Sequence, residues 1–419
     1  MRFNYRISDT PENRLLAGSL AGVFGNILIW PLLARSSSLA DLGILSLSLA
    51  VVAGLAPILL FGNNVTAVVS VNRLSEPGNR AMSTSGLLSL WRLLLMATSI
   101  LLLVSFFASN FYSNLAAYCA TQTGFILSLA LLRRFGEYLY FFVFNIFALI
   151  LGNLSLAFLV EWNFLPIQNF LTALSTWQLV SQIILFSRIR RKHEYHFELK
   201  NLFKSMGLLP HLVLYIVIVQ GGKYLISIRL SADELGRYQV LSVYAAGLLT
   251  LVIVSSPYLF DELAQSDDAA NDIQFERMYL KVKRLIVTIV ALTLIFFALT
   301  VVVHINQSDM KTIIQLHLSF LTASLIQIRN DYTSVFSLRL TKYFTLGLSS
   351  IFGVSISLIV MFLIDPTILI GSYFVCTALF VKMIAVRYFS GIKRNNRSMP
   401  LLDNLTFFCF CLLVFLAVI

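Results

Sequence analysis

Apolar runs long enough to cross a membrane recur along the whole chain. Each has about 18 to 25 residues, enough for a helix to cross a hydrocarbon core of about 30 Å. An outer-membrane barrel is excluded because strands that alternate apolar and polar residues are missing. The sequence therefore predicts an all-α polytopic membrane protein. We expect twelve core spans near 15–34, 40–71, 86–109, 112–132, 138–160, 164–187, 205–229, 234–256, 285–304, 311–328, 343–364 and 367–389, plus a short thirteenth hydrophobic helix at 403–419.

The charges follow a pattern that fits this topology. With 58% hydrophobic and 12% charged residues the chain is too apolar for a soluble protein, in which about a quarter of the residues are charged. The net charge of +11 could indicate nucleic acid, but the basic residues cluster in every second connection, so we expect no nucleic-acid partner. The positive-inside rule then places the N-terminus in the cytoplasm.

A weak internal repeat divides the chain. Asp41-Leu42-Gly43 corresponds to Glu234-Leu235-Gly236, which lies 193 positions later. At the same offset, Ala53-Gly54-Leu55 corresponds to Ala246-Gly247-Leu248. Internal repeats in a hydrophobic chain are typical of transporters, whose substrate site lies between the repeats. Chance similarity among apolar helices is the alternative, because Leu, Ala and Gly are common in membrane helices.

The domain organisation follows from a basic linker at 188–204. It separates an N-terminal six-helix lobe, 1–187, from a C-terminal six-helix lobe, 205–389, and a basic loop with the extra hydrophobic segment occupies 390–419. Six spans return the chain to its starting side, so both lobes enter the membrane in the same direction. This predicts a parallel pseudo-repeat with a cavity between the lobes.

Signatures of soluble enzymes are missing from the sequence. There is no glycine-rich phosphate loop ending in Lys-Ser or Lys-Thr and no His-Glu-x-x-His motif. The four cysteines lie within predicted spans and read as small apolar residues, and the five histidines are dispersed. We therefore expect no catalytic residue, no metal site and no cofactor, and we do not expect an enzyme.

Three cations lie inside predicted spans: Arg92, Lys223 and Lys382. A charge at mid-helix costs about 2.5 to 3.5 kcal/mol on insertion scales, so each is a candidate functional residue. Together they predict a cationic cavity that binds an anion, and the fork of an arginine suits phosphate. The alternative is that these long side chains reach the nearest interface and do nothing more. Two glycines before Lys223 favour a functional role there.

Further candidates are polar groups near the outer ends and in the spans. Arg35 and Arg229 occupy near-matching outer positions of the two lobes, where they could guide a phosphate or anchor at lipid headgroups. Asn64 and Asn145 could meet sugar hydroxyls or bond neighbouring helices. We include all four in the predicted diphosphate and glycan site.

Short motifs in the first 260 residues carry a family resemblance. They are the run Trp30–Arg35 followed by Ala40–Gly43, and Gly222–Ile226 with Asp233–Tyr238. The first resembles the opening, and the second resembles the seventh and eighth helices, of polysaccharide flippases of the O-antigen (Wzx) type, in the multidrug/oligosaccharidyl-lipid/polysaccharide exporter superfamily. The chain departs from the family at Gly222, where members commonly carry an Asp, and in its thirteenth hydrophobic segment.

The resemblance implies transport of undecaprenyl-diphosphate-linked oligosaccharide repeat units across the bacterial inner membrane, by alternating access, for O-antigen or capsule synthesis. The partners it implies are this lipid-linked oligosaccharide, membrane lipid and other glycan-assembly membrane proteins. A diphosphate needs cations inside the bilayer, which agrees with the charges described above.

Two alternatives stay open. An ion-coupled small-molecule exporter of the same fold would bury carboxylates near the midplane, whereas Glu137 and Asp331 lie toward the ends of predicted spans. A membrane glycan polymerase or ligase would carry a large external loop, and no external connection here is that long.

Overall fold

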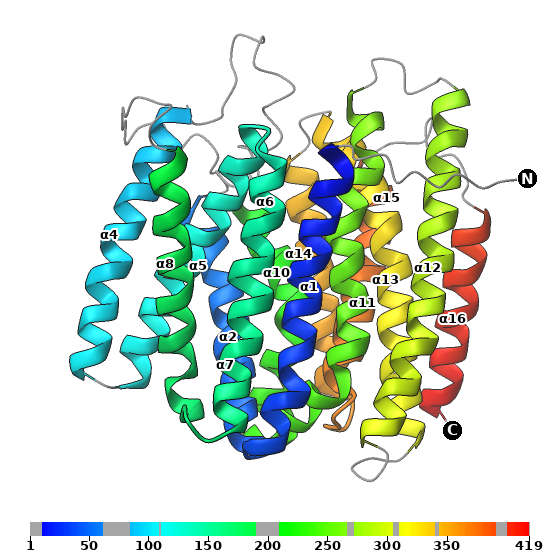
Figure 1. Ribbon diagram of the computed structural model, residues 1–419. Coiled ribbons are helices and arrows are strands. Elements are labelled where there is room, and N and C mark those ends of the chain that lie inside the picture. Colours follow the sequence, from blue (N-terminus) through cyan, green and yellow to red (C-terminus); the bar gives the residue numbers. More distant parts are fainter. Residues whose placement is uncertain are drawn as a thin grey trace, which may run out of the picture.

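A computed structural model describes residues 11–61, 84–108, 110–189, 209–265, 272–304, 310–339, 343–390 and 400–418. Within these residues all regular structure is helical, and the helices make thirteen passes between the two ends of one bundle (Figure 1). Ten of the described helical segments are long and apolar enough to cross a membrane. The prediction of an all-α polytopic membrane protein with an extra C-terminal helix is confirmed.

The first six passes form what we call the N-terminal half, and the remaining seven form the C-terminal half. The N-terminal half consists of α1 (Pro11–Ser36), α2 (Leu39–Leu59), α4 (Thr84–Ala108), α5 (Phe111–Arg134), the fifth pass built from α6 (Tyr138–Asn145), η2 (Ile146–Leu151) and α7 (Gly152–Glu161), and α8 (Phe170–Ile189), which the short η3 (Ile167–Asn169) precedes. The C-terminal half consists of α10 (Leu209–Arg229), α11 (Ala232–Gln265), α12 (Asp272–His304), α13 (Met310–Arg339), α14 (Tyr343–Leu363), α15 (Ile370–Ser390) and α16 (Pro400–Val418).

The bundle has two distinct ends. We call the end where α1 finishes and α2 begins the Arg35 end. The other is the basic end, where α5 and α8 finish with Arg133, Arg134 and Arg188. Helix α1 begins at the basic end, and α16 finishes at the Arg35 end (Figure 1).

Matching N-caps start α2 and α11 at the Arg35 end. The Ser38 hydroxyl accepts a hydrogen bond from the Asp41 N–H at 3.1 Å, and the Ser231 hydroxyl accepts one from the Glu234 N–H at 3.2 Å. Such a cap satisfies one of the backbone donors that the first helical turn leaves unpaired. Both caps immediately precede the repeated motif, so the repeat marks the start of equivalent helices.

The second pass ends earlier than the predicted span of 40–71. The helix α2 stops at Leu59, and Phe61 has a left-handed φ of 49° that a helix cannot continue through. Of the three expected bend points, Gly54 and Pro57 lie within α2. The third, Gly62, and the rest of the predicted span fall outside the described residues.

The two halves meet most closely where the repeated glycines lie. Helix α2 packs against α10 and α11, and α1 packs against α11. A Cβ added to Gly43 would overlap the carbonyl oxygen of Ala232, and one added to Gly236 would overlap the carbonyl oxygen of Leu39. Each glycine therefore lets its own helix approach the first turn of the other, and the contact is reciprocal.

A buried hydrogen bond follows one turn further into the bundle. The Ser46 hydroxyl donates to Gln239 Oε1 at 2.7 Å, and these residues are separated by 193 positions, the offset of the repeat. Equivalent residues of two repeats can touch only near the axis that relates them. The pseudo-symmetry axis of the bundle therefore runs between α2 and α11.

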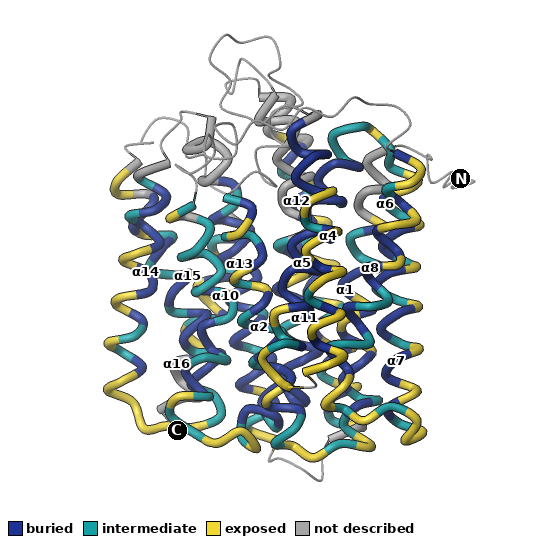
Figure 2. Tube along the Cα trace, turned by 90° about the vertical axis from the view of Figure 1, so that its left-hand side faces the viewer, coloured by how far each residue is buried: buried dark blue, intermediate teal, exposed yellow. Residues whose placement is uncertain are grey.

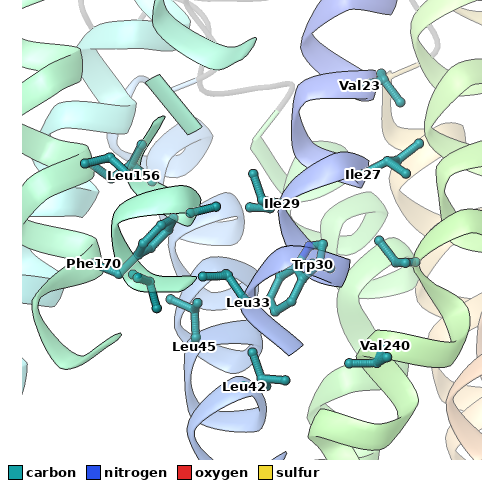
Figure 3. Close-up of a cluster of buried hydrophobic side chains, with 14 of the residues drawn as sticks. Val23, Ile27, Ile29, Trp30, Leu33, Leu42, Leu45, Leu156, Phe170 and Val240 are labelled. Carbon is teal, nitrogen blue, oxygen red and sulfur yellow. The ribbon is translucent and has the colours of Figure 1, made fainter. Parts of the chain in front are cut away.

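An apolar cluster also crosses between the halves (Figure 3). Trp30 on α1 and Leu42 on α2 face Val240 on α11 in a group of fully buried side chains. The remaining labelled members come from α1, α2, α7 and α8: Val23, Ile27, Ile29, Leu33, Leu45, Leu156 and Phe170. Its close packing holds the halves together at the Arg35 end.

The outer surface of the bundle carries large exposed apolar side chains. Along α4 these include Ile100, Leu103 and Phe107, and along α14 they include Ile359 and Leu363. In the tube view α14 alternates buried and exposed residues along its length (Figure 2). A belt of exposed apolar side chains is the surface expected to face lipid.

The thirteenth hydrophobic segment forms a complete helix that packs on α13. Asp403 at its start pairs with the buried Arg329 of α13 at 3.5 Å, and Phe410 stacks on Phe380 of α15 with ring centroids 4.8 Å apart. The segment is therefore an integral part of the C-terminal half.

The contact between the repeated glycines is testable by adding one methyl group. Gly236→Ala should lower the apparent melting temperature of the purified protein, because the new Cβ meets a backbone carbonyl that cannot move aside without separating α2 from α11. The matched control is Gly347→Ala on α14, where the nearest atom to a new Cβ is 4.0 Å away. Equal melting temperatures for both variants would contradict the close contact.

Candidate functional site

Lys223 lies on α10 beside a tight crossing of α10 and α15. A Cβ added to Gly222 would overlap the carbonyl oxygen of Gly371, and one added to Gly221 would overlap the ring of Phe374. The two glycines therefore bring α10 close to α15. The same contact explains the departure from the flippase pattern at Gly222, since an aspartate side chain has no room there.

The Lys223 side chain projects from α10 between α15 and the N-terminal half. Gly222 faces α15, while the Tyr224 hydroxyl donates to the carbonyl oxygen of Ala50 on α2 at 2.9 Å. Successive residues of a helix are turned by about 100°, so Lys223 lies between these two directions. It is partly buried, and it makes no hydrogen bond or ion pair with any residue that the structure describes.

Lys382 on α15 has a different environment. It is 2% exposed, and its ammonium nitrogen lies over the ring of Tyr215 at 4.6 Å from the centroid. Asp331 on α13 acts electrostatically on both Lys382 and Tyr215. A cation over an aromatic face with a carboxylate nearby is well compensated. Lys382 is therefore held inside the C-terminal half by its neighbours.

Two amides of α13 extend this group, which we call the α13 polar cluster: Tyr215, Gln327, Asn330, Asp331 and Lys382. Gln327 Nε2 donates to Asp331 at 2.6 Å, and Asn330 Nδ2 donates to the carbonyl oxygen of Leu379 at 3.1 Å. The amide oxygens of Gln327 and Asn330 are buried without a hydrogen-bond partner in the described part of the chain.

Lys223 and the α13 polar cluster are separate sites. Tyr215 and Lys223 are eight residues apart on α10, which corresponds to about 12 Å along the helix axis. Lys223 lies nearer the Arg35 end, and Tyr215 lies nearer the basic end. The two lysines therefore differ: Lys223 has no partner among the described residues, and Lys382 is compensated by Tyr215 and Asp331.

Arg92 does not join either lysine. It is exposed on α4, which packs mainly against α5 and α8, and its neighbours Leu93 and Met96 are exposed as well. The expectation that Arg92, Lys223 and Lys382 line one cavity is wrong for Arg92. The physical reason is that α4 is a peripheral helix, and its buried stripe carries Trp91 and Leu95 instead.

Arg35 and Arg229 occupy equivalent positions and bind protein groups. Arg35 is largely exposed and pairs with Glu161, at the end of α7, at 3.3 Å. Arg229 donates to the carbonyl oxygens of Met361 and Ile364, the latter at 3.0 Å, at the end of α14. Each arginine thus fastens the first helix of its half to the fifth.

Of the two asparagines in the predicted site, the structure describes Asn145 but not Asn64. Asn145 is buried, its amide donates to the carbonyl oxygen of Phe141 at 2.9 Å, and its side chain lies against Gly22 of α1. It therefore serves a helix contact, the alternative considered above. Asn64 lies outside the described residues.

Sequence reasoning missed Tyr215 as the partner of Lys382, and it missed the Ser46–Gln239 bond. The repeat offset of 193 would have identified that bond, because Ser46 and Gln239 are repeat-related. No local signal links Tyr215, Asp331 and Lys382, which come from three different helices. Asp331 was expected near a helix end, whereas it acts on a buried lysine.

Solved structures with the same fold are transporters. One is a MOP superfamily transporter from Pyrococcus furiosus, described as having a binding pocket of reverse polarity that suggests a different function; it has a TM-score of 0.56 and 13% identity over 90% of this chain and 93% of that one. Another is a MATE structure in complex with MaL6, with a TM-score of 0.53 and 12% identity over 94% and 97%. No protein-family model and no curated protein matches the sequence. At these identities the likeness shows the fold.

The two lysines should respond differently to the same substitution. Lys382→Met should destabilise the protein by about 2 kcal/mol, because it removes a desolvated cation from the face of Tyr215. Lys223→Met should leave stability unchanged or raise it, because it removes an unpaired charge from a span. Thermal unfolding of both variants in the same detergent measures the difference. A larger loss for Lys223→Met would contradict this assignment.

Proposed function

We propose that this chain, which folds like a MOP superfamily transporter, is a flippase for undecaprenyl-diphosphate-linked oligosaccharide repeat units in the bacterial inner membrane. The observation that carries the proposal is Lys223, a cation without a protein partner among the described residues, between α15 and the N-terminal half. Such a charge is costly inside a bilayer unless an anion compensates it. A diphosphate is an anion of the right kind.

The contacts between the halves support a direction of access. The halves are closed at the Arg35 end by Gly43, Gly236 and the Ser46–Gln239 bond. Toward the basic end, Ala53 on α2 and Thr250 on α11 are exposed although both helices are central. A substrate would therefore enter from the basic end, which the positive-inside rule assigns to the cytoplasm.

Transport then requires the halves to rock about their contact. The diphosphate is held at Lys223, the glycan occupies the space between the halves, and the polyprenyl tail stays in the bilayer. Opening the Arg35 end requires α2 and α11 to separate, which breaks the Ser46–Gln239 bond and the two glycine contacts. Closure of the basic end while the Arg35 end is open completes alternating access.

The proposal predicts that Lys223→Met abolishes flipping while the protein remains folded. Lys223→Arg should retain most activity, because it keeps the positive charge and can bind phosphate. Arg92→Ala is the matched control, since Arg92 is an exposed cation on a peripheral helix. The measurement is complementation of a glycan-producing bacterium that lacks its own flippase, with mass spectrometry of polyprenyl-diphosphate lipids and staining of surface polysaccharide.

The outcomes of this measurement separate the alternatives. Single-repeat lipid that accumulates facing the cytoplasm in the deleted strain supports the flippase. Single repeats that reach the outer leaflet without polymerising would instead support a glycan polymerase or ligase. Normal transport by Lys223→Met at normal abundance would overturn the site.

One observation favours an ion-coupled exporter as the second candidate. Asp331 is a carboxylate that acts on the buried Lys382 and Tyr215, the kind of group that ion coupling needs. If this candidate is correct, Asp331→Asn should abolish efflux of small cationic compounds driven by a proton gradient in proteoliposomes. If the flippase is correct, no such efflux occurs with the unmodified protein either.

A further inference from the structure

A polar pocket lies on the N-terminal half at the Arg35 end, away from Lys223. Its volume is about 350 Å³, within the range of small-molecule sites, about 300 to 1,000 Å³. Most of its lining is polar: Ser36, Ser37, Ser38, Asp41, Asn163 and Gln168. Apart from the N-cap that Ser38 and Asp41 form, these residues have no role in the fold or in the proposed transport site described above.

The pocket is built from two connections that are fastened to each other. Ser36, Ser37 and Ser38 join α1 to α2, and Asn163 and Gln168 belong to the segment between α7 and α8. The Arg35–Glu161 ion pair joins the start of one connection to the start of the other. Because both connections are in the N-terminal half, the pocket does not depend on how the two halves are arranged.

Several hydrogen-bonding groups of the pocket have no protein partner. The Ser37 hydroxyl is buried and makes no hydrogen bond among the described residues. A buried polar atom without a partner costs free energy, unless a bound molecule satisfies it. The side chains of Ser36, Asn163 and Gln168 also make no hydrogen bond with any described residue. These hydroxyl and amide groups are the donors and acceptors that a ligand would meet.

The chemistry of the lining selects a neutral ligand rich in hydroxyl groups. Asp41 is the one charged side chain of the lining, and its carboxylate already accepts a hydrogen bond from the Ser38 hydroxyl at 2.7 Å. No group of three metal-ligating side chains occurs among the described residues, which argues against a metal ion as the ligand. An anion would be repelled by Asp41. The other four residues of the lining are apolar: Val160, Leu165, Pro166 and Ile167.

Asn163 adjoins two exposed aromatic residues in the chain. Trp162 and Phe164 are 63% and 76% exposed, and neither is among the residues that line the pocket. The hydroxyl and amide groups of the lining are the groups that would bond sugar hydroxyls. Asn163 itself has a left-handed φ of 60°, a conformation that asparagine tolerates better than most residues.

We propose that this Arg35-end pocket is a carbohydrate-binding site for one or two neutral or N-acetylated sugar residues. The choice of a glycan as ligand rests on the proposed function, because the Arg35 end is where a translocated glycan would emerge. The pocket holds the sugar portion while the diphosphate is released from Lys223.

The experiment measures sugar binding directly on the full-length protein in nanodiscs, by saturation-transfer NMR and isothermal titration. The probes are glucose, galactose, N-acetylglucosamine and the disaccharide chitobiose, with glucuronic acid as the anionic comparison. We expect the neutral and N-acetylated sugars to bind and glucuronic acid to bind at least tenfold more weakly.

Three variants localise the binding. Gln168→Ala and Asn163→Gly should each weaken sugar binding about threefold to tenfold, the effect of losing one or two hydrogen bonds; glycine also preserves the left-handed backbone at position 163. Ser36→Trp should abolish binding by filling the pocket. The matched control is Ser231→Ala, which alters the equivalent N-cap of α11 and should leave sugar binding unchanged.

The outcomes separate this inference from the proposed function. One outcome is that the unmodified protein binds sugar, that Ser36→Trp loses this binding, and that the unmodified protein does not flip lipid-linked oligosaccharide. This outcome would support the pocket and overturn the flippase. Flipping without measurable sugar binding, or binding that all three pocket variants leave unchanged, would overturn the pocket alone. Glucuronic acid binding as tightly as the neutral sugars would also overturn it.

Discussion

The close approach of α2 and α11 at Gly43 and Gly236 is the contact on which the arrangement of the two halves depends. Each glycine faces a backbone carbonyl of the other helix, so neither position has room for a side chain. This approach allows the Ser46–Gln239 bond to form and lets the apolar cluster around Trp30 and Leu42 reach Val240. In the proposed transport cycle this small area is the contact that would have to open, because packed helix contacts have few alternative arrangements.

Pseudo-symmetry explains why some conspicuous charges are structural. Arg35 fastens α1 to the end of α7, and Arg229 fastens α10 to the end of α14. These are equivalent helices of the two halves. Each half is therefore braced in the same way at the Arg35 end, as the proposed rocking of the two halves requires. The Arg35–Glu161 pair also keeps the α1–α2 and α7–α8 connections next to each other, and the polar pocket lies between them.

The intramembrane cations have the same sign but different surroundings. Lys382 has Tyr215 beneath its ammonium group and Asp331 nearby, Arg92 is exposed at the flank of the bundle, and Lys223 has no partner within the described residues. The cost of a charge in a bilayer depends on whether it is paired, exposed or isolated. Of the three, Lys223 is the one whose surroundings are the basis for the proposed anionic ligand.

The sequence by itself determined the membrane-spanning helices, their number and the repeat that relates the halves. Span length and apolar composition are local properties, so they survive any arrangement of the helices. The residues Gly43 and Gly236 were visible as a repeat, but their reciprocal contact required the helices to be placed side by side. Likewise Arg92 and Lys223 look alike in the sequence, and α4 and α10 differ in what surrounds them. Tertiary structure alone decided the partners of Lys382 and the polar pocket, because each joins residues from helices or connections that are distant in the chain.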